Sequence, residues 1–445
     1  MKIILTILTF FSITLLAQSY LVSNIPLPKT YVQNLDPYPC DEGCMQEYLD
    51  NDLIFSFLAH ASSTQLSNPE HDEMRMISIS VLNLGSSIEE MKLKIALLLP
   101  YKKIGRYAAS TTNAAFAYLI ARNQSFELKT YNIESEEFED VEAALLKMQK
   151  DEFNYIIAPL TLKGAETLVS LNPYEEIYFP TIHKKDINST LPNIYFGGID
   201  YKAQSDVLLQ EAVSPLVIFY DKSTIGKSLA KYEEEKFKFK EKIDENATQE
   251  ILSDNSEGYF IELDEFDAQV DNTQVLRDEN RTVIKYSIPR RVTNIEEQLL
   301  YNDDIMQGSM FINTPIVKTS MIMSQITMYD VNATNVLSTQ INYNPLVLSL
   351  TQYVDREKMI IANSITHNNS IFIETNSLLG NDIVYDWINY TTTVGMDYFF
   401  NKITRQDKQY NIEMLDNQMQ YPIELLRPSQ TRFIKYESVV EEALN

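Results

Sequence analysis

The sequence is poor in metal-binding residues and in positive charge. It contains 2 Cys and 4 His among 445 residues, and apart from the two cysteines these side chains lie far apart in the chain. Structural zinc sites need closely spaced Cys and His ligands, so we expect no bound metal. The 62 acidic residues outnumber the 37 basic ones, for a net charge of −25. A surplus of that size repels phosphate backbones and anionic lipids, which excludes nucleic-acid binding as a main function.

Common catalytic motifs are also missing. Neither Gly-x-Ser-x-Gly nor His-Glu-x-x-His occurs, and no histidine has a second His or Cys at ligand spacing. Residues 221–228 end in Gly-Lys-Ser, as a nucleotide-binding loop does, but the leading Gly is absent and Asp221 stands where a phosphate would approach. We therefore predict that the protein is not an enzyme and uses no cofactor.

The N-terminus has the pattern of a secretory signal. Lys2 precedes an apolar run from Ile3 to Leu16, and the small residues Ala17 and Ser19 follow. We predict a signal peptide over residues 1–19. The apolar run is shorter than the roughly 20 residues that span a bilayer, and no later run is long enough either. We expect a mature protein that is soluble in the periplasm.

Two further features fit an oxidising compartment outside the cytoplasm. Cys40 and Cys44 can close a local disulfide there, whereas a redox role is disfavoured by their spacing and by the neighbouring Asp41 and Glu42. Seven Asn-x-Ser/Thr sites occur, and four have an Asp two positions before the Asn: Asn188, Asn246, Asn280 and Asn332. This extended pattern resembles the acceptor site of periplasmic N-glycosylation in Campylobacter and related epsilonproteobacteria. The resemblance implies a source of that kind, and glycans on these four residues if their loops are exposed and the cell has the transferase.

Hydrophobic periodicity predicts two α/β lobes after an N-terminal extension. Residues 20–92 form the extension, with a helix over 45–61. Buried strands then alternate with helices from residue 93 onward, which predicts doubly wound parallel sheets. The expected ranges are lobe I at 93–213, lobe II at 214–355 with an acidic insertion at 244–281, a return to lobe I at 356–402, and closing strands with a C-terminal tail at 403–445.

The order of these segments resembles the type I periplasmic-binding fold. Lys94-Ile-Ala-Leu-Leu-Leu-Pro100, the Ala-rich helix after Gly105, Ile156-Ile-Ala-Pro-Leu160 and Val217-Ile-Phe-Tyr-Asp221 look like that family's successive strands and turns. The resemblance covers residues 93 to 436. It implies either a binding protein linked to a transporter or receptor, or a protein similar to the outer-membrane activators of penicillin-binding proteins.

Basic residues are concentrated in the loops that follow the expected strands of lobe I. The loops 101–106, 161–164 and 181–186 hold six Lys or Arg in sixteen positions. In parallel sheets, ligands bind at the carboxyl ends of the strands, so these loops favour an anionic ligand, although exposed Lys on solvated loops is the simpler explanation. The candidate ligand-binding residues are Lys102, Lys103, Arg106, Lys163, His183 and Lys184, with Asp221 and Ser223 in lobe II.

Two functional hypotheses follow. In the first, the lobes close around a small polar ligand, favoured to be an anion, and the closure reports ligand occupancy to a transporter or receptor. In the second, the protein is a cell-envelope interaction protein, similar to the activators of peptidoglycan synthases, that binds its partner through an acidic surface or the segment 244–281.

Overall fold

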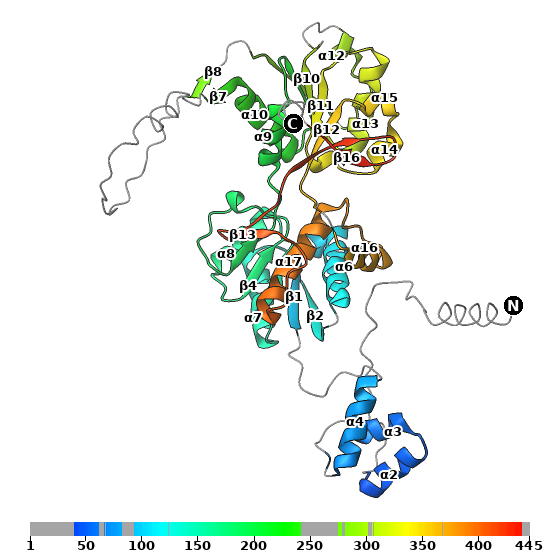
Figure 1. Cartoon of the computed structure of the whole chain (residues 1–445). Helices are drawn as coiled ribbons and strands as arrows, with labels where there is room; N and C mark the ends of the chain where they lie inside the picture. The colour runs from blue at the N-terminus through cyan, green and yellow to red at the C-terminus, as the bar shows by residue number, and fades with distance from the viewer. Residues whose placement is uncertain are drawn as a thin grey trace, which may run out of the picture. The chain divides into compact units, whose positions relative to one another are not determined.

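The computed structural model describes residues 40–61, 66, 68–81, 93–122, 124–241, 275–277, 281–300, 305, 307–366 and 368–437 (Figure 1). The chain divides into two compact units. Unit 1 comprises residues 1–198 and 367–420, and unit 2 comprises residues 199–366 and 421–445. The predicted signal peptide lies outside the described residues. Within the described part of the chain, no helix combines the length and apolarity needed to cross a bilayer.

The N-terminal extension folds as three short helices, drawn in blue in Figure 1: α2 Glu42–Asp50, α3 Ile54–Ala61 and α4 Pro69–Val81. They enclose a small core of Met45, Phe57, Leu58 and Ala61. The single helix predicted over residues 45–61 is wrong, because the chain turns between α2 and α3, where Asp52 adopts a φ of 56°. That left-handed conformation ends a helix.

Unit 1 is built on a sheet of seven strands in the order β13-β14-β5-β4-β3-β1-β2. Strands β1 to β5 run parallel, β14 is parallel to β5, and β13 is antiparallel to β14. The strands are β1 Leu93–Leu99, β2 Phe126–Asn132, β3 Tyr155–Ile157, β4 Glu176–Phe179, β5 Ile194–Phe196, β13 Glu413–Leu415 and β14 Gln418–Gln420.

Helices cover both faces of this sheet. Besides α2, α3 and α4, the described helices of unit 1 are α5 Tyr101–Ile104, α6 Arg106–Ala121, α7 Phe138–Lys150, α8 Leu162–Ser170, α16 Ser370–Leu378, α17 Trp387–Thr404 and the 3₁₀ turn η1 Lys184–Asp186. Helices α7 and α8 share one hydrophobic core with Ile177 and Phe179 of β4. Tyr178 points the opposite way, because side chains alternate along a strand, and its ring contacts Phe399 of α17.

Unit 2 repeats the design with the order β16-β15-β12-β11-β10-β6-β9. Strands β9, β6, β10, β11 and β12 run parallel, and β15 and β16 add an antiparallel hairpin. The strands are β6 Leu216–Tyr220, β9 Val283–Ser287, β10 Ser309–Asn313, β11 Asn335–Ser338, β12 Met359–Asn363, β15 Glu424–Pro428 and β16 Phe433–Lys435.

The helices of unit 2 form two layers around its sheet. They are α9 Tyr201–Gln210, α10 Thr224–Lys238, α12 Glu296–Leu300, α13 Ile316–Met328, α14 Leu346–Leu350, α15 Tyr353–Arg356 and the 3₁₀ turn η3 Gln340–Asn342. Helices α9 and α10 pack on one face of the sheet, and α12, α13 and α14 contribute to the core on the other. A separate antiparallel pair, β7 Phe239–Glu241 and β8 Val275–Arg277, follows α10. The predicted insertion at 244–281 lies mostly outside the described residues.

The two parallel-dominated sheets with flanking helices confirm the predicted fold class. The expected boundaries between the lobes need correction. Helix α9, expected in lobe I, packs on the second sheet, and β12, expected in the return to lobe I, pairs with β11 there. The closing strands expected within residues 403–445 divide between the two sheets: β13 and β14 join the first sheet, while β15 and β16 join the second. Long-range strand pairing, which hydrophobic periodicity does not report, decides both points.

Candidate functional site

The candidate site in unit 1 is the edge where β1, β3 and β4 end. These strands are neighbours in the sheet and run parallel, so the loops that follow them lie along one edge. The three basic segments singled out in the sequence are those loops. Side chains at this edge, together with the N-termini of the helices that follow, are positioned to meet a ligand.

Three of the predicted basic residues already have acidic partners. Lys102 forms an ion pair with Glu134, Lys163 pairs with Glu137, and the Nζ of Lys184 lies 2.5 Å from Oδ2 of Asp416. These pairs are largely exposed, so each adds little to stability. They do reduce the positive potential of the edge. An anionic ligand would have to compete with three carboxylates, which the local sequence did not reveal.

Arg106 and Lys103 have no such carboxylate partner among the described residues. Gly105 separates α5 from α6 with a φ of 54°, a conformation that glycine adopts easily, and thereby turns the chain at this point. Arg106 begins α6, donates a 3.4 Å hydrogen bond from Nη2 to the Tyr107 hydroxyl and lies 5.2 Å from the centre of that ring. Both basic side chains are exposed. They are the positive groups most available to a ligand at this edge.

The loop after β4 is fastened to the sheet. The backbone N–H of Lys184 donates to Oε1 of Gln418 in β14 at 2.9 Å. His183 precedes the 3₁₀ turn η1, and its Nδ1 accepts the backbone N–H of Lys185 at 3.1 Å. The imidazole is thus engaged in shaping the turn.

In unit 2, Asp221 and Ser223 organise the first turn of α10. The carboxylate of Asp221 accepts the backbone N–H of Ser223 at 3.1 Å and also the Ser223 hydroxyl. The Ser223 oxygen in turn accepts the backbone N–H of Gly226 at 3.0 Å. Through these contacts both side chains stabilise the N-terminus of α10. Both residues belong to unit 2, whereas the basic loops belong to unit 1.

Sequence reasoning missed the buried carboxylates, among them Glu136 and Glu233. Glu136 is 2% exposed and lies between β2 and α7, where its carboxylate contacts Thr161 at the start of α8. Glu233 of α10 is fully buried in unit 2. It accepts hydrogen bonds from the Ser205 hydroxyl at 3.0 Å and from Nδ2 of Asn313 at 2.6 Å. Burial raises the pKa of Glu233 to about 8, so the side chain is mostly protonated at neutral pH.

Neither carboxylate belongs to a recognisable catalytic motif, so the sequence analysis did not identify them. Charge patterning was the one available signal for Glu136, because it lies in the run Glu134-Ser-Glu-Glu137 directly before a helix. Among the described residues, no group of three or more His, Cys, Asp or Glu side chains is arranged to hold a metal ion.

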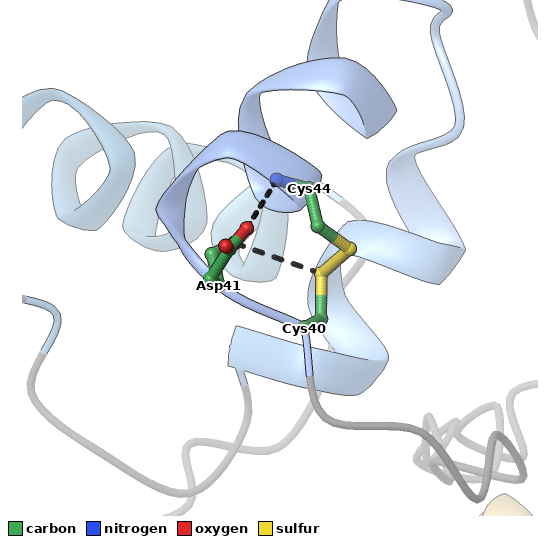
Figure 2. Close-up of a disulfide and its surroundings, with 3 residues drawn as sticks. All are labelled: Cys40, Asp41 and Cys44. Carbon is green, nitrogen blue, oxygen red and sulfur yellow. Dashed lines mark hydrogen bonds between the residues drawn. A yellow bond between two sulfur atoms is a disulfide. The ribbon is translucent and has the colours of Figure 1, made fainter.

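The predicted disulfide between Cys40 and Cys44 is present at the start of α2 (Figure 2). Asp41 caps this helix, because its Oδ1 accepts the backbone N–H of Cys44 at 2.9 Å. The bridge therefore closes the same turn that the cap stabilises.

The glycosylation sites differ in accessibility. Asn188 and Asn332, which have the preceding Asp, are exposed, while Asn246 and Asn280 lie outside the described residues. Asn368 and Asn389, which lack that Asp, are buried at 5% and 2% exposure. A transferase acting on the folded protein can reach the first two and not the last two.

Comparisons with known proteins establish the fold. No family model and no curated protein matches the sequence. A putative branched-chain amino acid ABC transporter protein from Rhodospirillum rubrum is similar in structure, with 9% identity and a TM-score of 0.54, over 78% of this chain and 100% of that one. A solute-binding protein from Rhodopseudomonas palustris, solved with p-hydroxybenzoic acid, has 9% identity and a TM-score of 0.50, over 78% and 96% of the two chains.

The C-domain of LpoA from Haemophilus influenzae, a regulator of PBP1A, is a weaker match, with 7% identity and a TM-score of 0.47 over 77% of this chain and 100% of that one. The two matches at TM-scores of 0.54 and 0.50 show that the chain has the α/β fold of the type I periplasmic binding proteins. At these identities the likeness concerns the fold. The comparisons do not support an epsilonproteobacterial source.

Proposed function

We propose that this protein is a non-catalytic binding protein of the periplasm that binds a small polar ligand. The observation that carries the proposal is the polar strand edge of unit 1, where the loops after β1, β3 and β4 are neighbours and present the exposed side chains of Lys103 and Arg106. Two proteins that bind or transport small solutes have the same fold at TM-scores of 0.54 and 0.50, which supports this reading.

The eight candidate residues take different parts in this proposal. Lys103 and Arg106 contact the ligand directly. Lys102, Lys163 and Lys184 contact the ligand only after each has released its carboxylate partner. His183 shapes the loop after β4, and Asp221 and Ser223 shape the first turn of α10 in unit 2.

Native mass spectrometry of the chain purified from periplasm, without refolding, tests whether a small molecule co-purifies. A second test measures the melting temperature with leucine, glutamate, p-hydroxybenzoate, phosphate, glucose and glycinamide. We expect one of these chemical classes to raise it, and Lys103→Ala combined with Arg106→Ala to abolish the rise while leaving the circular dichroism unchanged. An empty protein that none of these compounds stabilises contradicts ligand binding.

A second function is favoured by one specific observation: three of the lysines at the strand edge of unit 1 are neutralised by acidic partners. Because Lys102, Lys163 and Lys184 are paired internally, the edge keeps less free positive charge than its sequence suggested. This suits an interaction protein of the cell envelope, similar to the activators of peptidoglycan synthases, in which the strand edge binds no ligand. In that case Lys103→Ala and Arg106→Ala leave capture of a periplasmic partner unchanged.

A further inference from the structure

The loop between β2 and α7 places a carboxylate at the N-terminus of α8. Oε1 of Glu136 accepts the backbone N–H of Thr161 at 2.7 Å, and Oε2 accepts the Thr161 hydroxyl. Thr161 is the N-cap of α8, and Glu136 is 2% exposed. A fully desolvated carboxylate with two donors is therefore held where β3 leads into its helix.

This arrangement completes a capping box with a residue from elsewhere in the chain. In the usual box, the side chain at the third helical position accepts the N–H of the N-cap residue. That position in α8 is Gly164, which has no side chain to do so. A Cβ on Gly164 would lie 2.6 Å from the carboxyl carbon of Glu136. The glycine thus leaves the space that the Glu136 carboxylate fills.

The same loop also neutralises its surroundings. Glu134 pairs with Lys102 and Glu137 pairs with Lys163, so residues 134–137 supply three carboxylates to the strand edge. A helix N-terminus at the end of a parallel strand attracts an anionic group, since its N–H groups are unpaired and the helix dipole is positive there. At α8 the carboxylate of Glu136 already accepts the N–H and the hydroxyl of the N-cap residue Thr161, and its negative charge repels a second carboxylate.

We propose that Glu136 is a specificity-determining residue that excludes carboxylate groups from the N-terminus of α8. The proposal rests on the binding function proposed above and narrows its ligand class. The group that a ligand presents to the loop after β3 is uncharged or cationic, and any anionic part of it is directed to Arg106 and Lys103 instead.

The test removes the internal carboxylate and supplies one in solution. The thermal unfolding of the whole chain is measured for wild type, Glu136→Ala and the matched control Glu137→Ala, which loses the same charge from an exposed neighbour. Each is measured with 100 mM sodium formate, sodium chloride or formamide. We expect Glu136→Ala to lower the melting temperature of unit 1 by about 5 °C. Formate should restore at least half of that loss, and neither chloride nor formamide should do so.

Either of two results with Glu136→Ala and its control overturns the proposal. One is that formate stabilises wild type or Glu137→Ala as much as Glu136→Ala, because the helix terminus would then be open in the native protein. The other is a folded Glu136→Ala that formate does not stabilise. If Glu136→Ala does not fold, Glu136→Ser takes its place, because its short side chain also leaves the space of the carboxylate open; a rise in formate is again expected, and the absence of any rise counts against the proposal.

These outcomes are independent of the ligand search. Formate rescue requires no physiological ligand, so it can succeed even if the binding function fails. Conversely, if p-hydroxybenzoate or glutamate binds wild type and loses affinity in Thr161→Val while Glu136→Ala binds no more tightly, the binding function stands and the exclusion of carboxylates fails.

Discussion

Glu233 makes the stability of unit 2 depend on pH in a direction that can be worked out from its surroundings. The side chain is fully buried, and its partners are the neutral groups of Ser205 and Asn313. Desolvation raises the pKa from the ordinary 4.5 to about 8. The folded state therefore holds a proton that the unfolded state releases between these two values, and stability must fall as pH rises through that interval.

The magnitude follows from the size of that interval. Each pH unit between the two pKa values changes the free energy of unfolding by about 1.4 kcal/mol. Because of Glu233, the free energy of unfolding is therefore about 3 kcal/mol lower at pH 7 than at pH 4.5. Glu233→Gln keeps the shape, stays neutral and can still accept a hydrogen bond from Asn313. We expect this variant to be more stable than wild type at pH 7, by up to about 3 kcal/mol, and no more stable near pH 4.5.

Two measurements test the pH dependence and the effect of Glu233→Gln. Urea unfolding is followed by circular dichroism from pH 5 to 8.5, and hydrogen exchange of peptides from α9 and β10 reports on unit 2. Glu234→Gln is the matched control. Partial burial acts to raise the pKa of Glu234, but hydrogen bonds and charge interactions with Lys238 and Lys285 together outweigh it and lower the pKa. The contribution of Glu234 to stability is therefore lost as pH falls, which is the opposite direction to Glu233. An unchanged pH dependence in Glu233→Gln, or a loss of stability at pH 7, would refute the reasoning.

Three further predictions concern packing and modification. The buried guanidinium of Arg356 donates to the carbonyl oxygens of Thr351, Ser429 and Gln430. We expect Arg356→Ala to lower the free energy of unfolding by about 3 kcal/mol in urea, against no measurable change for the exposed Arg432→Ala. Gly395→Ala would place a Cβ 2.2 Å from the Tyr178 ring, and we expect a loss of about 2 kcal/mol, whereas Gly43→Ala, whose nearest neighbour lies at 3.5 Å, should be tolerated. In a host with the glycosylating transferase, Asn188→Gln and Asn332→Gln should each remove one glycan mass from the intact protein and Asn389→Gln none; identical masses for all three variants contradict the assignment.

Much of the fold was predictable from local pattern. The apolar run from Ile95 to Leu99 predicts a strand buried on both faces, and β1 is such a strand, between β3 and β2 in the first sheet. The edge strand β9, by contrast, was not predicted. It alternates half-buried and exposed residues and includes Lys285, so its short sequence resembles a surface loop until it pairs with β6.

The sequence by itself determined the alternation of strands and helices, the strand-end positions of the basic loops and the pairing of the two cysteines, because each depends on residues close together in the chain. Tertiary structure decided how much free positive charge those loops present to a ligand. Glu134 and Glu137 neutralise lysines that lie 32 and 26 residues away, and Glu136 reaches the start of α8, 25 residues further on. Such contacts form only when the sheet brings the loops together, since carboxylates and ammonium groups pair through space and carry no periodic signal along the chain.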